Sequence, residues 1–449
     1  MTLYDQHPTV LRYRSKGLTI SNSRTPKVDA AWLKKTCMEL GADDVGFVDL
    51  ADEALDDQRE LILSAFPNAR SLIAFVHKMG RENLRSPARS PANLEFHQTT
   101  DEVNEISHKI AAALEERGIG AFYAAAGFPM EMDHWGIGRT WIISHKPISV
   151  AAGLGRIGIH RNVIHPIFGN FIVLGTVVID AEISDYGHPI DYNPCLECKL
   201  CVAACPTGAI GPDGSFNFSA CSTHNYREFM GGFVDWVETL ADSHDGKQYR
   251  AMVKDSETVS IWQSLSYGPN YKAAYCIGVC PAGEDVIGPF LDDREGYVKK
   301  VLRPFTNKVE TIYVVPGSDA ESYVRKQFPH KPLRLVGNGF RPRSAKAFLQ
   351  MLPVVFQKGQ SKGLDATFHF IFKGEEVFQG TVVIRDQKIQ VMLGLEAEPT
   401  LRIEADSAAW LRFLRKEQSI LTAILTRKIR IRGPIDCLLA FGRCFPTKR

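Results

Sequence analysis

The chain has 449 residues, with 53 Lys and Arg against 51 Asp and Glu, for a formal net charge of +2. This length exceeds one hydrophobic core and favours two or three domains. The charge is near neutral and the basic residues are dispersed, so we expect no nucleic-acid or anionic-membrane partner. Residues 171–179, the longest apolar run, are too few to span a bilayer, and the N-terminus has no secretory pattern. We therefore expect a cytoplasmic protein without a transmembrane segment.

The N-terminal half predicts an arm followed by an α/β domain. Residues 1–30 are polar and basic, as expected for a surface arm. Residues 31–185 alternate between amphipathic helical patterns and apolar strand patterns. The elements predicted there are a helix–glycine–strand unit at 28–50 with Gly41 between helix and strand, a strand at 69–78, a second such unit at 102–125, and a strand at 170–180. This alternation predicts a sheet covered by helices.

The C-terminal part predicts a separate α+β domain over residues 336–449, after a connecting segment at 291–335 that includes one possible strand, VETIYVVPG. Its predicted elements are a helix at 344–359, a strand at 365–374 with Phe368, Phe370 and Phe372 on one face, a hairpin turning at Asp386, a strand at 399–405, and a helix capped by Asp406.

Between these domains, residues 186–290 show little regular pattern but hold seven of the ten cysteines. Ten cysteines in a protein expected to be cytoplasmic argue for metal or redox chemistry rather than a disulfide scaffold. Cys195, Cys198, Cys201 and Cys205 stand at CxxCxxCxxxC spacing, and Pro206 follows. In bacterial ferredoxins the first three thiolates of such a run hold one cluster and the fourth reaches another. A zinc site is the less favoured interpretation of this run.

The second cluster needs ligands from further along the chain. Cys280 precedes Pro281 and is expected to complete the first cluster, with Cys195, Cys198 and Cys201. The second cluster would then use Cys205, Cys221 and Cys276. Ala273 occupies the position of the missing eighth cysteine. Two outcomes stay open: a three-iron cluster, or a four-iron cluster completed by His224 or by an exogenous ligand. Cys37, Cys437 and Cys444 are expected to be small buried hydrophobes instead.

Gly153, Gly155 and Gly158 match the GxGxxG spacing of dinucleotide-binding proteins, but their surroundings do not. That motif needs a strand before it and a long helix after it. Pro147 interrupts the preceding strand candidate, Pro166 follows closely, and Asp180 comes too late to contact a ribose. We expect these glycines to allow tight turns or the approach of a large flat ligand.

The stretches AGLGRIGIHRNVIHPIFGNFIVLGTVVIDAEI and CLECKLCVAACPTGAI resemble the epoxyqueuosine reductase and reductive dehalogenase superfamily over residues 30–290. The resemblance implies an α/β corrinoid-binding-like domain followed by a bacterial ferredoxin-like two-cluster domain. It implies a cobalamin cofactor and two iron–sulfur clusters, one 4Fe-4S and the other 4Fe-4S or 3Fe-4S. By position, the residues near the corrinoid would be Gly153, Gly155, Gly158, His160, Asn162 and His165. For His160 and His165, a structural hydrogen bond is an equal alternative.

The sequence departs from the queuosine enzymes at the proton donor. Those enzymes carry an acidic residue just upstream of the glycine-rich stretch, whereas WIISHKPISVAAG contains no carboxylate. Asp133, His134 and Arg139 cluster in a predicted loop nearby. Histidine is suited to deliver a proton at neutral pH, so His134 is the candidate acid. A solvated loop histidine is the alternative.

Residues 336–449 resemble the sterol carrier protein type 2 family through TVVIRDQKIQVML, PTLRIEADSAAWLRFLRK and AILTRKIRIRGPIDCLLAFGRCFP. The resemblance implies a lipid-carrier-like α+β fold with an apolar tunnel. A domain that only dimerises or covers the redox site is the alternative.

Together these patterns predict an iron–sulfur oxidoreductase that uses cobalamin to reduce a small or hydrophobic organic substrate. An electron donor such as ferredoxin or flavodoxin would supply electrons to the clusters. The protein is a candidate homodimer. The alternatives are a non-catalytic electron carrier whose C-terminal domain docks a ligand or partner, and a binding protein with structural or redox-sensing clusters.

Overall fold

The structure is a computed structural model that describes residues 3–16, 27–131 and 141–447. The chain divides into two compact units. The first unit comprises Met1–His77, Glu102–Leu154 and Leu174–Pro189. The second unit comprises Lys78–Asp101, Gly155–Val173 and Ile190–Arg449. The predicted domain boundaries stay predictions.

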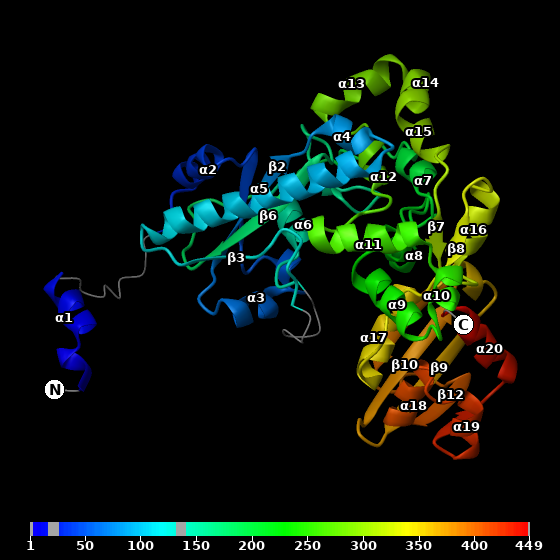
Figure 1. Cartoon of the computed structure of the whole chain (residues 1–449). Helices are drawn as coiled ribbons and strands as arrows, with labels where there is room; N and C mark the ends of the chain where they lie inside the picture. Colours follow the sequence, from blue (N-terminus) through cyan, green and yellow to red (C-terminus); the bar gives the residue numbers. More distant parts are fainter. Residues whose placement is uncertain (1–2, 17–26, 132–140, 448–449) are drawn as a thin grey trace. The chain divides into compact units, whose positions relative to one another are not determined.

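The first unit is built on a four-stranded sheet of order β1-β2-β6-β3 (Figure 1). Its strands are β1 (Asp44–Asp49), β2 (Ser71–Lys78), β6 (Ile172–Ile179) and β3 (Ala121–Tyr123). Both β1–β2 and β3–β6 are antiparallel pairs. β2 and β6 are buried along most of their length because their apolar runs leave no solvent face. Gly175 in β6 leaves room for the ring of Phe75, whose nearest atom would lie 2.2 Å from an added Cβ.

The helices of the first unit confirm most of the predicted pattern. They are α1 (Pro8–Ser15), α2 (Ala30–Glu39), α3 (Arg59–Ala65) and α6 (His145–Ala151), while α5 (Arg89–Glu115) contributes its residues from Glu102 onward. Asp29 caps α2 by accepting the Trp32 N–H at 2.7 Å. Leu33 and Cys37 are one turn apart in α2 and both are buried. The segment before Gly153 is the helix α6 rather than an interrupted strand, so a strand–glycine–helix unit is not formed there.

In the second unit, short elements carry the cysteine-rich segment. They are α4 (Arg81–Arg85), a hairpin of β4 (Arg156–Ile157) and β5 (Val163–Ile164), α7 (Leu200–Ala204), α8 (Phe218–Asn225), α12 (Tyr275–Gly278) and α13 (Glu284–Asp292). Elements of fewer than eight residues have little helical stability of their own. Their packing on a shared core therefore holds the cysteines in place.

The expectation of little regular pattern in residues 186–290 is wrong for its central part. Three helices separate Cys221 from Cys276: α9 (Met230–Ala241), α10 (Gly246–Met252) and α11 (Asp255–Tyr267). We call residues 226–271 the helical insertion. Arg227 holds this insertion together. Its side chain is 0% exposed and forms ion pairs with Asp235 at 2.7 Å and Glu257 at 3.0 Å. Charges inside a helical segment mask its apolar periodicity when they form buried pairs, and this is why the pattern was missed.

The predicted connecting segment is a packed part of the second unit. It forms α14 (Arg294–Tyr297), the π-helical turn η3 (Val298–Leu302), α15 (Arg303–Thr306), β7 (Ile312–Val314), α16 (Asp319–Gln327) and β8 (Leu333–Leu335). β7 and β8 pair in parallel. Phe305, Ile312 and Val324 from this segment share one hydrophobic core with Cys201 and Cys205. The segment thus supports the cysteine-rich region directly.

Residues 345–443 form a five-stranded sheet of order β11-β10-β9-β12-β13 with helices against it. The strands are β9 (Ala366–Lys373), β10 (Phe378–Arg385), β11 (Lys388–Leu393), β12 (Leu401–Asp406) and β13 (Ile429–Arg432), and the helices are α17 (Ala345–Val355), α18 (Ser407–Leu414), α19 (Ile420–Leu425) and α20 (Ile435–Arg443). The hairpin turn falls at Asp386, as predicted, with φ of 50° there and 56° at Gln387. Asp406 caps α18 by accepting the Ala409 N–H at 2.8 Å.

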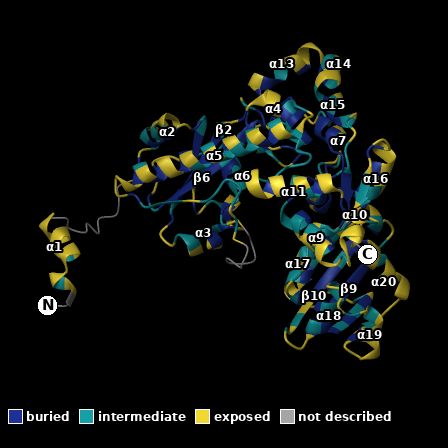
Figure 2. Cartoon of the chain, in the orientation of Figure 1, coloured by how far each residue is buried: buried dark blue, intermediate teal, exposed yellow. Residues whose placement is uncertain are grey.

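The strand β9 is buried on both faces, which its alternating sequence did not predict. Phe368, Phe370 and Phe372 point into an aromatic core with Trp410 and Phe441. The intervening Thr367, His369 and Ile371 are buried as well. Figure 2 shows β9 as a dark strand beside exposed helices such as α19 and α20. Among the described residues, no helix is both long enough and apolar enough to cross a membrane.

Candidate iron–sulfur site

The four cysteines predicted to hold the first cluster surround one small hollow in the second unit. This hollow has a cavity volume of only about 10 Å³. It is lined by Ile159, His160, Cys195, Leu196, Cys198, Lys199, Cys201, Cys280, Pro281 and Ala282. Cys280 is far from the other three cysteines in sequence, yet the fold brings it to the same hollow. We call this group of residues the first cysteine site.

Local backbone geometry presents the first three cysteines to the hollow. Glu197 and Lys199, on either side of Cys198, have φ values of 49° and 63°. Two left-handed residues so close together curl the chain around Cys198. Lys199 then starts α7, which contains Cys201, and Cys205 ends it by donating its N–H to the Cys201 carbonyl at 3.2 Å. The CxxCxxC spacing therefore wraps the chain around one point.

The Cys280 side is fixed by a close approach between two loops of the second unit. Gly169 has φ of +66°, and a Cβ there would lie 2.1 Å from the Ala282 carbonyl oxygen. Glu284 donates its backbone N–H to the Pro166 carbonyl at 2.9 Å. Glycine at 169 is thus required both by the backbone conformation and by the contact. The contact holds the Cys-Pro-Ala turn against the hollow.

Burial and backbone N–H groups set the electrostatics of the thiols. Burial raises the pKa of Cys280 to about 12, and a hydrogen bond from the Ala282 backbone opposes this rise. Burial likewise raises the pKa of Cys198, opposed by a hydrogen bond from the Leu200 backbone and by the charge of Arg294. Burial raises the pKa of Cys201, and the neighbouring cysteines add to that rise. Such buried thiols need a cation to lose their protons, because metal binding and thiol deprotonation are coupled.

The donor set fits a multi-iron cluster better than a single zinc ion. Within the described ranges, no group of three or more His, Cys, Asp or Glu side chains is arranged to hold one metal ion. The four cysteines instead line one hollow, and three of them stand at the spacing of a bacterial ferredoxin run. Four thiolates with backbone N–H groups pointing at the sulfurs are the usual environment of a 4Fe-4S cluster. The first cysteine site therefore fits that cofactor.

The three cysteines proposed for the second cluster lie in the same unit. Cys205 is buried in the core that Cys221 and Cys276 also contact, and Ala273 packs against this core. Burial raises the pKa of Tyr226, and Cys221, Tyr271 and Cys276 add to the rise, so both thiols lie near its hydroxyl. The Ala273 N–H is donated to Asn225 Oδ1 at 2.8 Å. We call Cys205, Cys221, Cys276 and the Ala273 position the second cysteine site.

His224, one of the candidates for the missing ligand, is buried one turn after Cys221 on α8. Its Nδ1 accepts the Tyr313 N–H at 3.3 Å. Burial lowers the pKa of His224 to about 3, so the imidazole is neutral. With Nδ1 as the acceptor, Nε2 carries the hydrogen. The lone pair needed for an iron bond is thus already engaged.

The glycine-rich stretch falls in both units. Gly153 lies in the first unit, where it has φ of +78° and an added Cβ would meet the His188 carbonyl at 2.6 Å. In the second unit, Gly155 and Gly158 flank β4, and an added Cβ at either would clash with Ile164. These contacts account for the glycines by tight turns and close packing. Within the described residues, they provide no independent support for a corrinoid.

The two histidines of this stretch make structural hydrogen bonds. His160 is 4% exposed and its Nδ1 accepts the Asn162 N–H at 3.1 Å. His165 is 2% exposed and its Nδ1 accepts the Ile167 N–H at 3.1 Å. His160 also lines the first cysteine site. The proposed proton-donor group of Asp133, His134 and Arg139 lies outside the described residues.

The remaining cysteines behave as packing residues. Cys37 and Cys444 are buried, and Cys437 is half-buried. Burial raises the pKa of Cys37 to about 12 and that of Cys444 to about 11. A raised pKa keeps these thiols protonated and unreactive at neutral pH.

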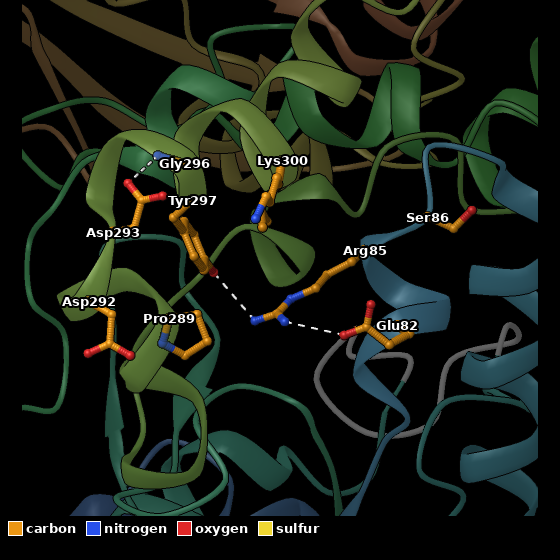
Figure 3. Close-up of a pocket in the computed structure, with 10 residues that line it drawn as sticks. Glu82, Arg85, Ser86, Pro289, Asp292, Asp293, Gly296, Tyr297 and Lys300 are labelled. Carbon is orange, nitrogen blue, oxygen red and sulfur yellow. Dashed lines mark hydrogen bonds and ion pairs between the residues drawn. The ribbon is translucent and has the colours of Figure 1, made fainter.

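A larger polar hollow, which sequence reasoning missed, lies between α4 and the α13–α14 turn (Figure 3). Its cavity volume is about 500 Å³. Arg85 points into it between Glu82 Oε1 at 3.4 Å and the Tyr297 hydroxyl at 3.5 Å. Burial raises the pKa of Tyr297 to about 12, and Cys280 and Cys198 add to that rise. Tyr297 therefore lines this hollow and lies near the first cysteine site.

Two protein families match parts of this sequence. The 4Fe-4S binding domain family matches residues 188–211, which include Cys195, Cys198, Cys201 and Cys205. The SCP-2 sterol transfer family matches residues 355–446.

Curated epoxyqueuosine reductases match part of the chain. The protein from Cellulophaga algicola is 30% identical over 112 residues, which cover 22% of this chain and 36% of that protein. The protein from Vibrio cholerae is 29% identical over 92 residues, which cover 20% of this chain and 24% of that protein. This chain thus spans about a third or less of the length of these relatives.

Solved structures give distant matches. An epoxyqueuosine reductase from Streptococcus thermophilus is 16% identical, with 61% of this chain and 74% of that chain covered and a TM-score of 0.33. A catabolic reductive dehalogenase in complex with 3-bromo-4-hydroxybenzoic acid is 16% identical, with 61% and 34% covered and a TM-score of 0.36. An epoxyqueuosine reductase with a tRNA-Tyr stem loop is 15% identical, with 62% and 81% covered and a TM-score of 0.34. In sequence, therefore, this chain resembles the epoxyqueuosine reductases over part of its length, contains a 4Fe-4S binding segment, and ends in an SCP-2 region.

Proposed function

We propose that this protein is an iron–sulfur oxidoreductase that reduces an organic substrate, with electrons passed between two clusters. The observation that carries the proposal is the meeting of Cys195, Cys198 and Cys201 with the distant Cys280 around one hollow. The sequence similarity to epoxyqueuosine reductases and the 4Fe-4S binding segment support an oxidoreductase. A bound cluster would accept and release single electrons.

The residues of this chain supply the surroundings of that chemistry. Cys195, Cys198, Cys201 and Cys280 would bind the first cluster. The backbone N–H groups of Leu200 and Ala282 donate hydrogen bonds to the Cys198 and Cys280 sulfurs, which favours the more negative, reduced state. Tyr297 and the core behind α7 exclude water from one side. Cys205 joins the two sites because it follows Cys201 by one helical turn and belongs to the second cysteine site.

The finer assignment is a corrinoid-dependent reductive cleavage, such as dehalogenation, of a small or hydrophobic substrate. It rests on sequence similarity, because the glycines expected at a corrinoid are accounted for by packing. The SCP-2 region favours an apolar substrate or ligand. The absence of a nucleic-acid partner stays a prediction from the near-neutral charge, and one distant relative was solved with a tRNA stem loop.

The test is the iron and cobalt content of protein purified without oxygen after expression with added cobalamin. We expect about seven or eight irons per chain, since each cubane cluster holds four. Cobalt near one per chain would support the corrinoid enzyme. Iron without cobalt would contradict the corrinoid-dependent reaction and favour the non-catalytic electron carrier. A protein without iron would contradict the whole proposal, and Cys37→Ala, which alters a buried packing cysteine, is the control variant.

A further inference from the structure

Arg89, at the start of α5, is a buried cation with unused hydrogen-bond donors. Its Nη1 and Nη2 atoms are buried and have no hydrogen-bond partner among the described residues. Its Nε donates to the Tyr271 carbonyl at 3.2 Å, and the guanidinium lies 5.2 Å from the centre of the Tyr275 ring. Arginine stays charged in proteins. A buried charge without an anion costs several kcal/mol, so this site is arranged for an anion.

Among the described residues, the carboxylate that acts on Arg89 does not fill that role. Glu310 acts on the pKa of Arg89, but its oxygens are already engaged. They accept the Tyr275 hydroxyl at 2.6 Å and pair with Lys308 at 3.0 Å and Lys331 at 2.9 Å. Two lysines around one carboxylate leave excess positive charge near Arg89. The anion must therefore come from another source.

The second cysteine site is that source. The Arg89 guanidinium lies 5.2 Å from the centre of the Tyr275 ring, and Cys276 directly follows Tyr275 in α12. Burial lowers the pKa of Arg89, whereas a thiolate at Cys276 favours the charged guanidinium. Cys276 also lies with Cys221 beside Tyr226. Tyr271, which accepts the Arg89 Nε–H, lies 5.9 Å from Tyr226 between ring centres. Arg89, Cys221 and Cys276 thus surround one aromatic cluster.

The second cysteine site offers three thiolates, so one corner of a cluster bound there has no cysteine ligand. A polar group of the protein is needed at that corner. Ala273 provides no sulfur there. His224 does not replace it, because its Nδ1 accepts the Tyr313 N–H and its Nε2 carries the hydrogen. Arg89 has two donor nitrogens, Nη1 and Nη2, without a hydrogen-bond partner among the described residues.

We propose that Arg89 is the counter-charge of the second cluster. Its Nη–H groups donate hydrogen bonds to the sulfurs at the corner that lacks a thiolate. The inference rests on the proposed function, because it requires a cluster at Cys205, Cys221 and Cys276. Charge-assisted hydrogen bonds are about twice as strong as neutral ones, so Arg89 stabilises the more negative, reduced cluster. Arg89 is a positioning and tuning residue and forms no bond to iron.

The test is a redox titration followed by electron paramagnetic resonance on the full chain purified without oxygen. We expect Arg89→Gln to lower the potential of the second cluster by about 59 mV or more, a tenfold change in a one-electron equilibrium. The potential of the first cluster should not change. Arg89→Lys keeps the charge and should restore part of the potential. Arg325→Gln, at an exposed arginine of α16, is the matched control and should change neither cluster.

A further variant supplies the missing thiolate. Ala273→Cys should lower the potential of the second cluster as well, because a fourth thiolate adds negative charge. An Arg89→Gln protein whose two clusters both keep their potentials would overturn the inference. So would a wild-type protein with only the first cluster. In the first case both cluster signals persist and the proposed function stands. In the second case the electron transfer between two clusters falls together with the inference, and loss of both signals in the wild type would contradict the proposed function as a whole.

Discussion

The two cysteine sites differ in how their residues are brought together. The first site takes three of its four cysteines from one short loop, whose left-handed residues at 197 and 199 curl it around a hollow. The second site takes its cysteines from three separate elements, and the helical insertion lies between Cys221 and Cys276. The first site is organised by local backbone geometry. The second depends on the packing of distant segments and on a buried arginine.

This difference shows which site needs additional stabilising contacts. A short loop loses little conformational entropy when its ends are brought together. Closing a long segment loses more conformational entropy. The second site offsets that cost with the ion pairs of Arg227 and with the core shared by α8, β7 and α16. The two sites should therefore respond differently to substitutions.

The largest effect is expected from removing one thiolate at each site. Cys198→Ala should abolish the first cluster, with loss of about four irons per chain. Cys221→Ala should remove only the irons of the second cluster and leave the first-cluster signal intact. Iron analysis and electron paramagnetic resonance measure both outcomes. If Cys198→Ala kept its full iron content, the first site would be wrongly assigned.

Breaking the buried ion pairs should affect the second site selectively. Arg227→Met leaves Asp235 and Glu257 as buried carboxylates without Arg227, which costs about 3–5 kcal/mol. We expect the second cluster to be lost more readily than the first during chemical denaturation. Arg325→Met removes an exposed pair with Glu321 and should cost at most about 1 kcal/mol. Equal destabilisation by the two variants would contradict the special role of Arg227.

The first site has its own sensitive contact at Gly169. Gly169→Ala combines a left-handed backbone with a clash against the Ala282 carbonyl, and should cost about 3 kcal/mol. Because Ala282 follows Cys280 so closely, the first cluster should become labile. The control is Gly363→Ala, which has φ of +80° but no atom within 4 Å of the added Cβ. Denaturation midpoints and the rate of cluster loss to a chelator distinguish the clash from backbone strain, and similar results for both variants would exclude the clash.

The smallest effect concerns pH and the helix that carries Cys221. Burial lowers the pKa of His224 to about 3, well below the value in an unfolded chain. As the pH falls below about 6.5, the unfolded state takes up a proton that the folded state does not accept, so stability decreases. From pH 7 to pH 5 this contributes about 2 kcal/mol. His224→Gln should show a correspondingly weaker decrease in the free energy of unfolding; equal decreases would show that His224 titrates normally.

Sequence reasoning succeeded where chemistry is encoded locally. The run from Cys195 to Cys205, the turn at Asp386 and the cap at Asp406 each depend on a few neighbouring residues. It failed for the helical insertion, whose charged residues form buried pairs that only the fold reveals. Arg89 gave no sequence signal, because nothing in its neighbours distinguishes a buried arginine from an exposed one. Cys280 was placed by the repeat of a Cys-Pro pair, and the structure brings it to the expected hollow.

The position of Cys276 and Cys280 after the helical insertion has a consequence for biosynthesis. Under the proposed ligand assignment, neither metal centre can be completed until the ribosome has made the insertion and the short α12 helix that follows it. The N-terminal part of the chain emerges first and folds first. Iron delivered too early would find only a partial set of thiolates. The insertion therefore delays the completion of both sites until the segment that follows it has been synthesised.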